Sequence, residues 1–263
     1  MASLFTKMRA LDNTSPTTIA DRNKNALRYG DVKPYDFNCI DTPEFVNASL
    51  LTSNTSDLSF IAAQGPIPDT ISSFWKMVYH HDVKVIVMLV DLPISKKSSY
   101  ERGNCHLYWP TDNPALYDGM TVELIKEEMA MQHSIKNDCT NIVIRDFKLT
   151  LNGTSKKATQ FHYLGWVDRS ITDELQMFKF LNFLNSFLVA NSIIFKVCVH
   201  CSAGCGRTGV FITLLTLMRL RNKKSSSTFE AVVLEYRKQR IYFIQTLVVD
   251  IYIGTIRILL QFL

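Results

Sequence analysis

One segment in the C-terminal third of the chain constrains the fold more than any other. Residues 192–200 (SIIFKVCVH) are rich in apolar and β-branched residues and predict a strand. Residues 208–221 (TGVFITLLTLMRLR) have the length and apolar spacing of a helix. Between them, residues 201–207 (CSAGCGR) contain two glycines and predict a tight loop. The chain therefore passes from a strand directly into a helix, as domains that contain both strands and helices require.

Further strands are expected earlier in the chain. Residues 83–90 (VKVIVMLV) form an almost continuous apolar run, typical of a strand that is buried on both faces. Residues 142–151 and 158–166 flank an Asn152-Gly153 turn and predict a hairpin. We expect residues 155–157 (SKK) to lengthen the connection between its two strands.

Two further helices and a single domain complete the predicted architecture. The length and spacing of residues 174–189 and 228–239 favour helices, so the fold class is α/β or α+β. The chain is 47% hydrophobic, which supplies enough apolar surface for a sizeable core. We find no internal repeat, low-complexity tract or interdomain linker. We therefore predict one domain over residues 1–263, with residues 1–20 as a loosely ordered N-terminal segment.

The loop at 201–207 has the composition of an anion-binding site. A tight turn points successive backbone N–H groups inward, and a helix that begins near Arg207 adds free N–H groups and its positive dipole end. The guanidinium of Arg207 can hold two phosphate oxygens at once. In this positive potential the pKa of the Cys201 thiol, ordinarily about 8.5, can fall by several units. The thiolate is a nucleophile toward phosphorus and can form a phosphocysteine intermediate.

Other interpretations of the cysteines remain open. Cys198, His200, Cys201 and Cys205 are four potential zinc ligands, although structural zinc sites usually draw paired ligands from separated segments. Strand alternation also gives Cys198 and His200 one face and Cys201 the other. Cys198 and Cys205 could be ordinary buried residues, which is the interpretation that we favour. A regulatory disulfide between Cys201 and a neighbour is also open, because a thiolate of low pKa oxidises readily.

Charge and cysteine usage favour a reducing, cytoplasmic compartment and an anionic substrate. The formal net charge of +5 suits such a substrate, but no block of like charges resembles a nucleic-acid-binding tail. Residues 1–13 carry charges where a signal peptide needs an apolar run. Residues 251–263 are apolar but too few to span a bilayer, and Arg257 interrupts them. We therefore expect no membrane segment and six reduced cysteines.

The whole segment HCSAGCGRTG, residues 200–209, resembles the signature of the protein tyrosine phosphatase family. The resemblance runs from Lys24 to the C-terminus, where further segments follow in family order: KNALRYGDV (24–32), NAS (47–49), QGP (64–66), 74–90, YWP (108–110) and QT (245–246). It implies a non-receptor-type catalytic domain with the phosphotyrosine protein phosphatase fold, a central twisted mixed β-sheet flanked by helices. It also implies hydrolysis of phosphotyrosine in proteins without a metal or organic cofactor.

The resemblance assigns roles to residues on either side of the signature. Tyr29 would pack against the phenyl ring of the substrate and impose a depth that phosphoserine and phosphothreonine cannot span. Asp31 would accept hydrogen bonds from the substrate's peptide backbone. Gln245 would orient the water that hydrolyses the phosphocysteine, and Thr208 would donate its hydroxyl to the departing thiolate.

The remaining implied site residues lie in or beside the loop. Glu101 would pair with Arg207 and hold its guanidinium in position, and Trp166 would support the loop that carries the general acid. The other implied residues are His200, in front of the nucleophile, and the substrate-binding Ser202, Ala203, Gly204, Cys205 and Gly206.

The acid-bearing segment departs from the family pattern. The family has Trp-Pro-Asp in a mobile loop, whereas this chain has Trp166-Val167-Asp168, followed by Arg169 and Ser170. Asp168 would protonate the leaving oxygen, an effect worth about 10²–10⁴-fold. Loss of proline should widen the conformational range of the loop, and Arg169 could depress the pKa of the acid. We therefore expect an active enzyme with reduced turnover.

Two smaller departures concern substrate handling. Gly30 lies where many relatives carry a larger, often basic residue, so we expect a weak preference for acidic peptides. Val249 lies where the family commonly has a second glutamine, so control of water in the hydrolytic step should differ.

Three functions remain open at this point. The first is phosphotyrosine hydrolysis on proteins, and the second is a catalytically weak pseudophosphatase that binds phosphotyrosine. A dual-specificity or phosphoinositide phosphatase ranks third, because residues 202–206 contain no lysine and Tyr29 implies a deep pocket. The altered acid segment also resembles phosphatases carried by polydnaviruses (bracoviruses) of parasitoid wasps, which implies action in the cytoplasm of infected host cells. Phosphotyrosine-containing proteins are the expected partners.

Overall fold

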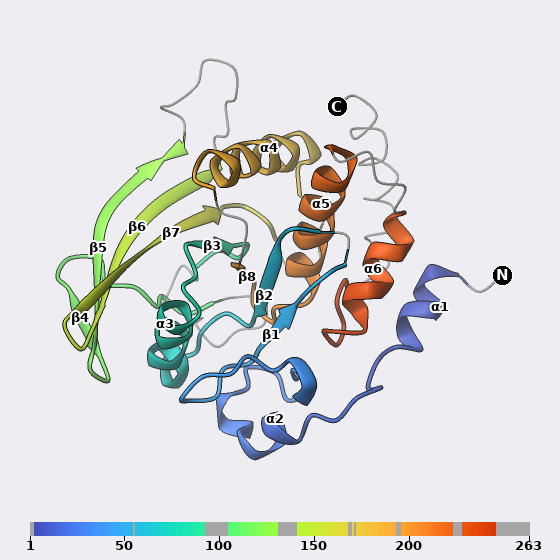
Figure 1. Cartoon of the computed structure of the whole chain (residues 1–263), viewed down its shortest axis with the longest axis horizontal. Coiled ribbons are helices and arrows are strands. Elements are labelled where there is room, and N and C mark those ends of the chain that lie inside the picture. Colours follow the sequence, from blue (N-terminus) through green and yellow to red (C-terminus); the bar gives the residue numbers. More distant parts are fainter. Residues whose placement is uncertain are drawn as a thin grey trace.

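The fold is built on one mixed sheet with helices on both faces (Figure 1). The computed structural model describes residues 3–54, 56–92, 105–130, 141–167, 170, 172–192, 196–222 and 228–245. Its strands are β1 Ala48–Leu51, β2 Ser59–Ala63, β3 Val85–Met88, β4 Ala115–Tyr117, β5 Met120–Met129, β6 Ile142–Leu151, β7 Thr154–Tyr163 and β8 Lys196–His200. Its α-helices are α1 Leu4–Arg9, α2 Thr18–Arg22, α3 Ile71–His80, α4 Glu174–Ala190, α5 Gly206–Asn222 and α6 Phe229–Arg237. Short 3-10 helices are η1 Lys24–Ala26, η2 Asp36–Asn38 and η3 Pro68–Thr70. A membrane crossing would need a longer or more apolar helix than any in these residues.

The strand order places several loops at one edge of the sheet. The order is β1-β2-β8-β3-β7-β6-β5-β4, in which β2, β8, β3 and β7 run parallel and the outer pairs antiparallel. The carboxyl ends of parallel strands meet at the same edge, where α/β proteins usually bind ligands. The loops that follow β2, β8 and β7 therefore emerge together. The predicted fold class is confirmed.

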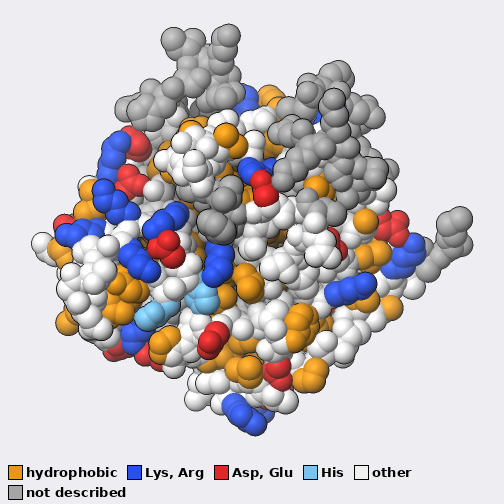
Figure 2. All heavy atoms as spheres, in the orientation of Figure 1, with side chains coloured by type: hydrophobic (Ala, Val, Ile, Leu, Met, Phe, Trp, Pro, Cys, Tyr) orange, Lys and Arg blue, Asp and Glu red, His pale blue; other side chains and the backbone are white. Residues whose placement is uncertain are grey.

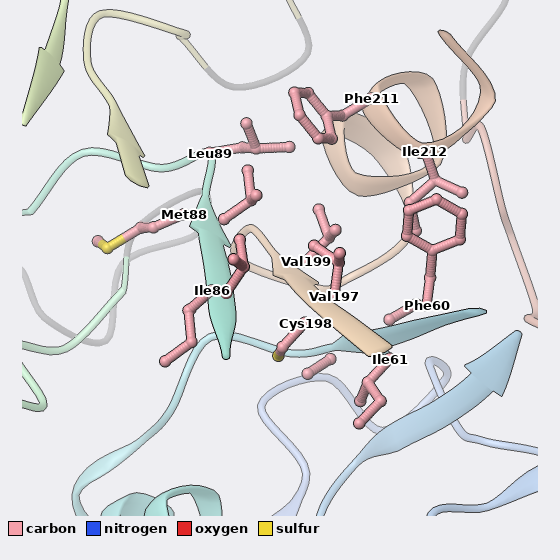
Figure 3. Close-up of a cluster of buried hydrophobic side chains, with 14 of the residues drawn as sticks. Phe60, Ile61, Ile86, Met88, Leu89, Val197, Cys198, Val199, Phe211 and Ile212 are labelled. Carbon is pink, nitrogen blue, oxygen red and sulfur yellow. The ribbon is translucent and has the colours of Figure 1, made fainter. Parts of the chain in front are cut away.

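The central strand β8 is buried on both faces. Val197 and Val199 lie beside Phe211 and Ile212 of α5, whereas Cys198 points to the other side of the sheet (Figure 3). All five of these side chains are inaccessible to solvent. A strand covered on both faces needs apolar residues at every position, which explains the uninterrupted run in the sequence.

Helix α3 covers the other face with aromatic residues. The ring of Phe74 meets Tyr108 edge-on with 5.0 Å between ring centroids and His200 at 5.8 Å. Trp75 meets Phe147 of β6 at 5.1 Å and donates its indole N–H to the Tyr108 carbonyl at 2.7 Å. Edge-to-face pairs of this kind each contribute about 0.5–1.5 kcal/mol beyond their buried area. They fix the end of β8 at His200, where the loop that contains Cys201 begins.

The predicted hairpin is present, but its expected longer connection is wrong. Leu151 pairs directly with Thr154, so Asn152 and Gly153 alone form the turn. Both have positive φ angles, 48° and 76°, as a two-residue type I′ turn requires. Residues 155–157 belong to β7, because this turn matches the right-handed twist of the strands and lets pairing begin at once.

The N-terminal residues pack against α6. Met8 of α1 is buried in the main core, and Lys7 forms an ion pair with Glu230. Asp12 accepts a 2.6 Å hydrogen bond from the guanidinium of Arg237, whose side chain is 3% exposed. The segment ahead of α2 is therefore tied to the C-terminal part of the fold.

Surface charges over β5 and β6 alternate in sign. Figure 2 shows basic and acidic side chains interspersed on this side of the molecule. The Lys126–Glu128 and Lys148–Glu123 ion pairs lie here, at 2.7 and 3.8 Å. Such exposed pairs contribute little to stability, and their mixed signs give no continuous basic surface.

Candidate active site

The loop after β8, residues 201–207, is called the nucleophile loop below. The amide of Gly65, which follows β2, donates to the Ser202 carbonyl at 2.9 Å. Gly204 has φ +70°, and a Cβ at this position would lie 2.1 Å from the Ala63 carbonyl oxygen. Only glycine fits, because the backbone conformation and the close approach to β2 both exclude a side chain.

Cys201 lies at the bottom of this loop and is 3% exposed. The Gly204 amide donates to its sulfur at 3.3 Å. Burial raises the pKa of the thiol, but the Arg207 guanidinium, the Thr208 hydroxyl and amide, and the Gly204 amide together lower it below its ordinary value. These donors face the sulfur because the loop leads into the N-terminus of α5. The site therefore favours a thiolate.

Cys201 differs in this respect from its neighbours. Burial raises the pKa of Cys198 and raises that of Cys205 to about 12. Burial likewise raises the pKa of Cys105 to about 12. Of these four thiols, Cys201 alone has its pKa lowered, so the effect comes from the donors of the loop and not from burial.

Thr208 lies where the sequence predicted it, at the start of α5. Its hydroxyl is buried without a hydrogen bond of ordinary geometry in the described residues, yet it is close enough to Cys201 to lower the thiol pKa. A buried hydroxyl is normally paired. This one is free to donate to the sulfur when negative charge returns there.

Arg207 connects the nucleophile loop to the loop after β7. Its side chain is mostly buried, and Nη1 donates to the Trp166 carbonyl at 2.8 Å. Arg207 thus contributes to the low pKa of Cys201 and also holds the start of the acid-bearing segment. Glu101, the predicted partner of Arg207, lies outside the described residues.

Residues 165–170 are called the acid loop below. Trp166 is buried, and its indole N–H donates to the Ser170 carbonyl at 3.1 Å. Val167 is 66% exposed and accepts hydrogen bonds from the Ser170 amide and hydroxyl at 3.2 and 2.7 Å. Asp168 and Arg169 lie outside the described residues. The structure therefore gives the frame of this loop but not the position of its carboxylate.

Arg240 was not predicted from the sequence. It is fully buried beneath the nucleophile loop and donates to the carbonyls of Gly204 and Ala203 and to the Ser49 hydroxyl, each at 3.2 Å. Holding these carbonyls on the outside leaves the loop amides facing the sulfur. No pattern around Arg240 in the sequence indicates these contacts, because its three partners lie 36, 37 and 191 positions away.

Tyr29 closes one side of the site. Its phenolic oxygen is 2.9 Å from the Ser202 hydroxyl. The preceding residue, Arg28, is held by Gln64: its amide donates to the Gln64 side-chain oxygen at 2.9 Å. The Asn47 side chain donates to the Val32 carbonyl at 2.7 Å. Asp31, between these anchors, is exposed, as a contact with an external peptide requires.

Gln245 approaches the loop from the segment after α6. Its side-chain oxygen is 3.9 Å from the Cys205 sulfur, and its backbone is fixed through the Ile244 amide, which donates to the Cys205 carbonyl at 3.1 Å. Tyr242 and Ile244 have φ values of 53° and 61°. This left-handed conformation is strained for Ile244, because its side chain is β-branched. Gly209 permits this path, because a Cβ there would lie 2.6 Å from the Ile244 nitrogen.

The comparison with protein families decides the identity of this site. The sequence profile described as protein-tyrosine phosphatase matches residues 23–260. The chain belongs to the protein-tyrosine phosphatase family. Members of this family are cysteine-dependent hydrolases.

Curated tyrosine phosphatases of both receptor and non-receptor types are similar to the chain. Tyrosine-protein phosphatase non-receptor type 2 of Homo sapiens is 30% identical over 255 residues, covering 92% of this chain and 58% of that protein. Receptor-type tyrosine-protein phosphatase eta of Gallus gallus is 30% identical over 234 residues, covering 85% of this chain and 16% of that protein. The chain thus spans well under two thirds of the length of these relatives.

Solved tyrosine phosphatase structures share the fold. The catalytic domain of human protein tyrosine phosphatase non-receptor type 18 matches with a TM-score of 0.77 and 28% identity, over 92% of this chain and 89% of that one. A second structure of this phosphatase, in complex with HER2 phosphopeptides, matches with a TM-score of 0.76 and 27% identity, over 92% and 86%.

The structure thus brings together most of the residues predicted for a tyrosine phosphatase site. Tyr29, Ser202, Cys201, Arg207 and Trp166 are linked by the contacts given above, and His200, Thr208 and Gln245 adjoin the nucleophile loop. Glu101, Asp168 and Val249 lie outside the described residues.

Proposed function

We propose that this chain hydrolyses phosphotyrosine in proteins through a phosphocysteine intermediate. The observation that carries the proposal is the lowered pKa of Cys201 in a buried loop that also presents Arg207. Burial alone would raise the pKa of Cys201, so the Arg207 guanidinium and the hydrogen-bond donors of the loop outweigh the effect of burial. A stabilised thiolate beside a guanidinium is what attack on a phosphate monoester requires.

In the first step the Cys201 thiolate attacks phosphorus and forms the S–P bond as the P–O bond to the tyrosyl oxygen breaks. Asp168 protonates the departing phenolate oxygen, so tyrosine leaves neutral. Arg207 and the amides of residues 202–206 carry the charge on the phosphate oxygens in the transition state.

In the second step water attacks phosphorus, and the S–P bond breaks. Gln245 orients this water and Asp168, now a carboxylate, accepts its proton. Thr208 donates its buried hydroxyl to the sulfur as the thiolate is restored. The products are inorganic phosphate and the starting enzyme, so the proposed cycle consumes only water.

Substrate selection follows from Tyr29 and Asp31. Tyr29 forms one wall of the pocket, where its ring stacks on the phenyl ring of phosphotyrosine. Its hydrogen bond with Ser202 ties that wall to the nucleophile loop. Asp31 accepts hydrogen bonds from the substrate's backbone. Glu101 pairs with Arg207 and holds its guanidinium in position.

Turnover is reduced by the acid loop. Val167 replaces the proline that restricts this loop in relatives, and its side chain is 66% exposed, without packing that could substitute for the ring. A smaller closed fraction lowers the rate of the step that needs Asp168. The same feature favours the alternative, a phosphatase-like module that binds phosphotyrosine and hydrolyses it only weakly.

Phosphate release from a phosphotyrosine peptide distinguishes these two functions. We expect release by the wild-type chain, its complete loss in Cys201→Ser and retention in Cys39→Ser, a half-buried thiol that is not part of the loop. We also expect trapping of the peptide by Cys201→Ser. Equal and negligible release by wild type and Cys201→Ser, with intact binding, would favour the binding module.

The role of Asp168 has its own test. Asp168→Asn should lower kcat by about 10²–10⁴-fold and remove the basic limb of its pH profile. An unchanged profile would exclude Asp168 as the acid. A phosphoserine peptide, expected to be inert, tests against dual specificity.

We further infer one catalytic domain over residues 1–263 that acts in the cytoplasm, and an origin in a bracovirus. The support for the origin is the resemblance of the acid loop, Trp166-Val167-Asp168, to that of polydnavirus phosphatases. Detection of the coding sequence in packaged viral DNA would support this origin, and its presence only in a cellular genome would exclude it.

A further inference from the structure

A chain of buried hydrogen bonds crosses the sheet and ends at the nucleophile loop. Arg145 of β6 donates through Nη1 to the Gln160 side-chain oxygen at 2.9 Å. The Gln160 amide nitrogen donates to the Tyr108 hydroxyl at 2.7 Å. That hydroxyl is 2.8 Å from Nε2 of His200. Nδ1 of His200 is 3.3 Å from the carbonyl oxygen of Cys201.

The direction of every bond in this chain is fixed at its start. An arginine can only donate, so the oxygen of the Gln160 amide must face it and the NH₂ group must face Tyr108. The buried Tyr108 hydroxyl accepts from Gln160, and the other polar group in contact with it among the described residues is Nε2 of His200, so its proton is donated there. The single proton of neutral His200 is then on Nδ1, where it donates to Cys201. Burial keeps His200 neutral, lowering its pKa to about 4.

The same arginine reaches the base of the acid loop. Its Nη1 is 3.2 Å from Nδ1 of His162, which must therefore accept. The proton of His162 is then on Nε2, which donates to the Val90 carbonyl at 2.9 Å. The next residue, Asp91, accepts from the Gly165 amide at 3.0 Å, immediately before Trp166.

Stability alone does not explain an arginine in this place. Arg145 is 7% exposed, and its guanidinium lies 4.4 Å from the centre of the Trp109 ring. It also pairs with Glu127, which is half exposed. Removing a charge from water is costly, and apolar residues often replace buried ion pairs without loss of stability. A group that must donate in two directions gives a specific reason for arginine.

We propose that Arg145 is a positioning residue that sets the tautomer of His200 through Gln160 and Tyr108 and the tautomer of His162 directly. This inference rests on the proposed phosphatase function only in its kinetic consequence. With its proton on Nδ1, His200 holds the Cys201 carbonyl and so orients the nucleophile. The opposite tautomer would put two lone pairs in contact there and release the loop.

Nitrogen NMR of histidine-labelled protein tests the assignment without using activity. We expect neutral His200 with its proton on Nδ1 and neutral His162 with its proton on Nε2. Gln160→Met keeps a side chain of similar length but removes the relay, so His200 should show mixed tautomers while His162 keeps its own. Arg145→Met should disturb both. Wild-type protein with the proton of His200 on Nε2 would overturn the proposal, whether or not the chain is a phosphatase.

Kinetics supply the second readout. Gln160→Met and Tyr108→Phe should each lower kcat/KM roughly tenfold, as a slightly misplaced reacting group does. The acid limb of the pH profile should move to higher pH. The loop amides no longer face the sulfur in these variants, so the pKa of Cys201 rises. Arg145→Lys, which still donates, should retain more activity than Arg145→Met. Lys148→Met, an exposed position on the same strand, is the control and should match wild type.

Other groups around His200 do not change in these variants. Arg28 and Arg207 lower the pKa of His200, the Cys201 carbonyl raises it, and Phe74 packs against its ring. Thermal unfolding identifies any variant that fails to fold, in which case the Tyr108→Phe result decides. A folded Tyr108→Phe variant with unchanged His200 tautomer and unchanged kcat/KM would refute the relay.

Discussion

The nucleophile loop is held from outside along its length, whereas the described part of the acid loop is held from outside at its first two residues and by its own atoms beyond them. Carbonyls of residues 202–204 are fixed by Gly65, which follows β2, and by Arg240. In the acid loop, Ser170 donates to Val167 and Trp166 donates to Ser170. Outside groups bond to its start: the Gly165 amide donates to the Asp91 carboxylate at 3.0 Å, and Arg207 donates to the Trp166 carbonyl at 2.8 Å. A site for developing charge must be organised before the substrate arrives, while a proton donor needs to approach only once the substrate is bound.

The largest loss of activity is expected from a substitution in the nucleophile loop at a position that tolerates no side chain. Gly204→Ala puts a methyl group 2.1 Å from the Ala63 oxygen at a positive φ. We expect phosphatase activity to fall by roughly 10²-fold or more, because the amides turn away from the sulfur. Gly119→Ala, which also has a positive φ but open space around it in the turn between β4 and β5, is the control. Wild-type activity in a folded Gly204→Ala variant would mean that the loop tolerates rearrangement.

Arg240 tests whether outside support matters beyond stability. Arg240→Met leaves carbonyl acceptors without donors and should lower the free energy of unfolding by about 2–4 kcal/mol. It should also weaken binding of inorganic phosphate or vanadate. Arg219→Met, which removes a bidentate pair with Asp57 far along α5, controls for loss of a partly buried arginine. If the two variants bind phosphate equally well, Arg240 has only a structural role.

Acidification probes the residues beneath both loops. His200 lies under the nucleophile loop and His162 under the acid loop, and burial lowers their pKa values to about 4 and about 3. Unfolded histidine has a pKa of about 6.5, so the unfolded state binds more protons below that pH, and stability falls as pH falls. Each histidine should cost about 2 kcal/mol at pH 5 relative to neutral pH.

Denaturant unfolding of His162→Gln at neutral pH and at pH 5 measures one of these contributions. The variant should lose less stability on acidification than wild type, while His80→Gln, at an exposed position, should lose the same amount. An identical loss in all three proteins would contradict the buried, neutral state of His162.

A substitution in the acid loop should change kcat much less than the substitutions in the nucleophile loop. Val167→Pro restores backbone restriction at an exposed position. Restricting a loop in a compatible conformation is worth about 0.4–1 kcal/mol, so kcat should rise about two- to fivefold with little change in the pKa of Cys201. Pre-steady-state kinetics would locate the gain in the step that cleaves the P–O bond. A decrease in kcat would show that Val167 does not limit the loop.

The sequence was most informative where structure is local. The period change around Cys201 predicted β8, the loop and α5, and the apolar run at 83–90 predicted β3, because these signals arise from residues adjacent in the chain. The direct turn at Asn152 and Gly153 was underestimated, since the flanking lysines read as loop residues although they extend β7. The supporting groups were predictable only in part. Arg240 acts on partners far away in the sequence, and nothing in its neighbouring residues indicates those contacts. The pairing of Arg145 with Gln160 follows from the register of the Asn152-Gly153 hairpin, but the link from Gln160 through Tyr108 to His200 joins segments far apart in the chain.

The nucleophile loop holds Cys201 as a thiolate. The rate at which iodoacetamide alkylates Cys201, measured as a function of pH, reports the pKa of this thiol directly. Cys201→Ser supplies the background from the other thiols. We predict a midpoint below about 7 that moves upward in Arg207→Met. A midpoint at or above about 8.5, the ordinary value for cysteine, would contradict the account.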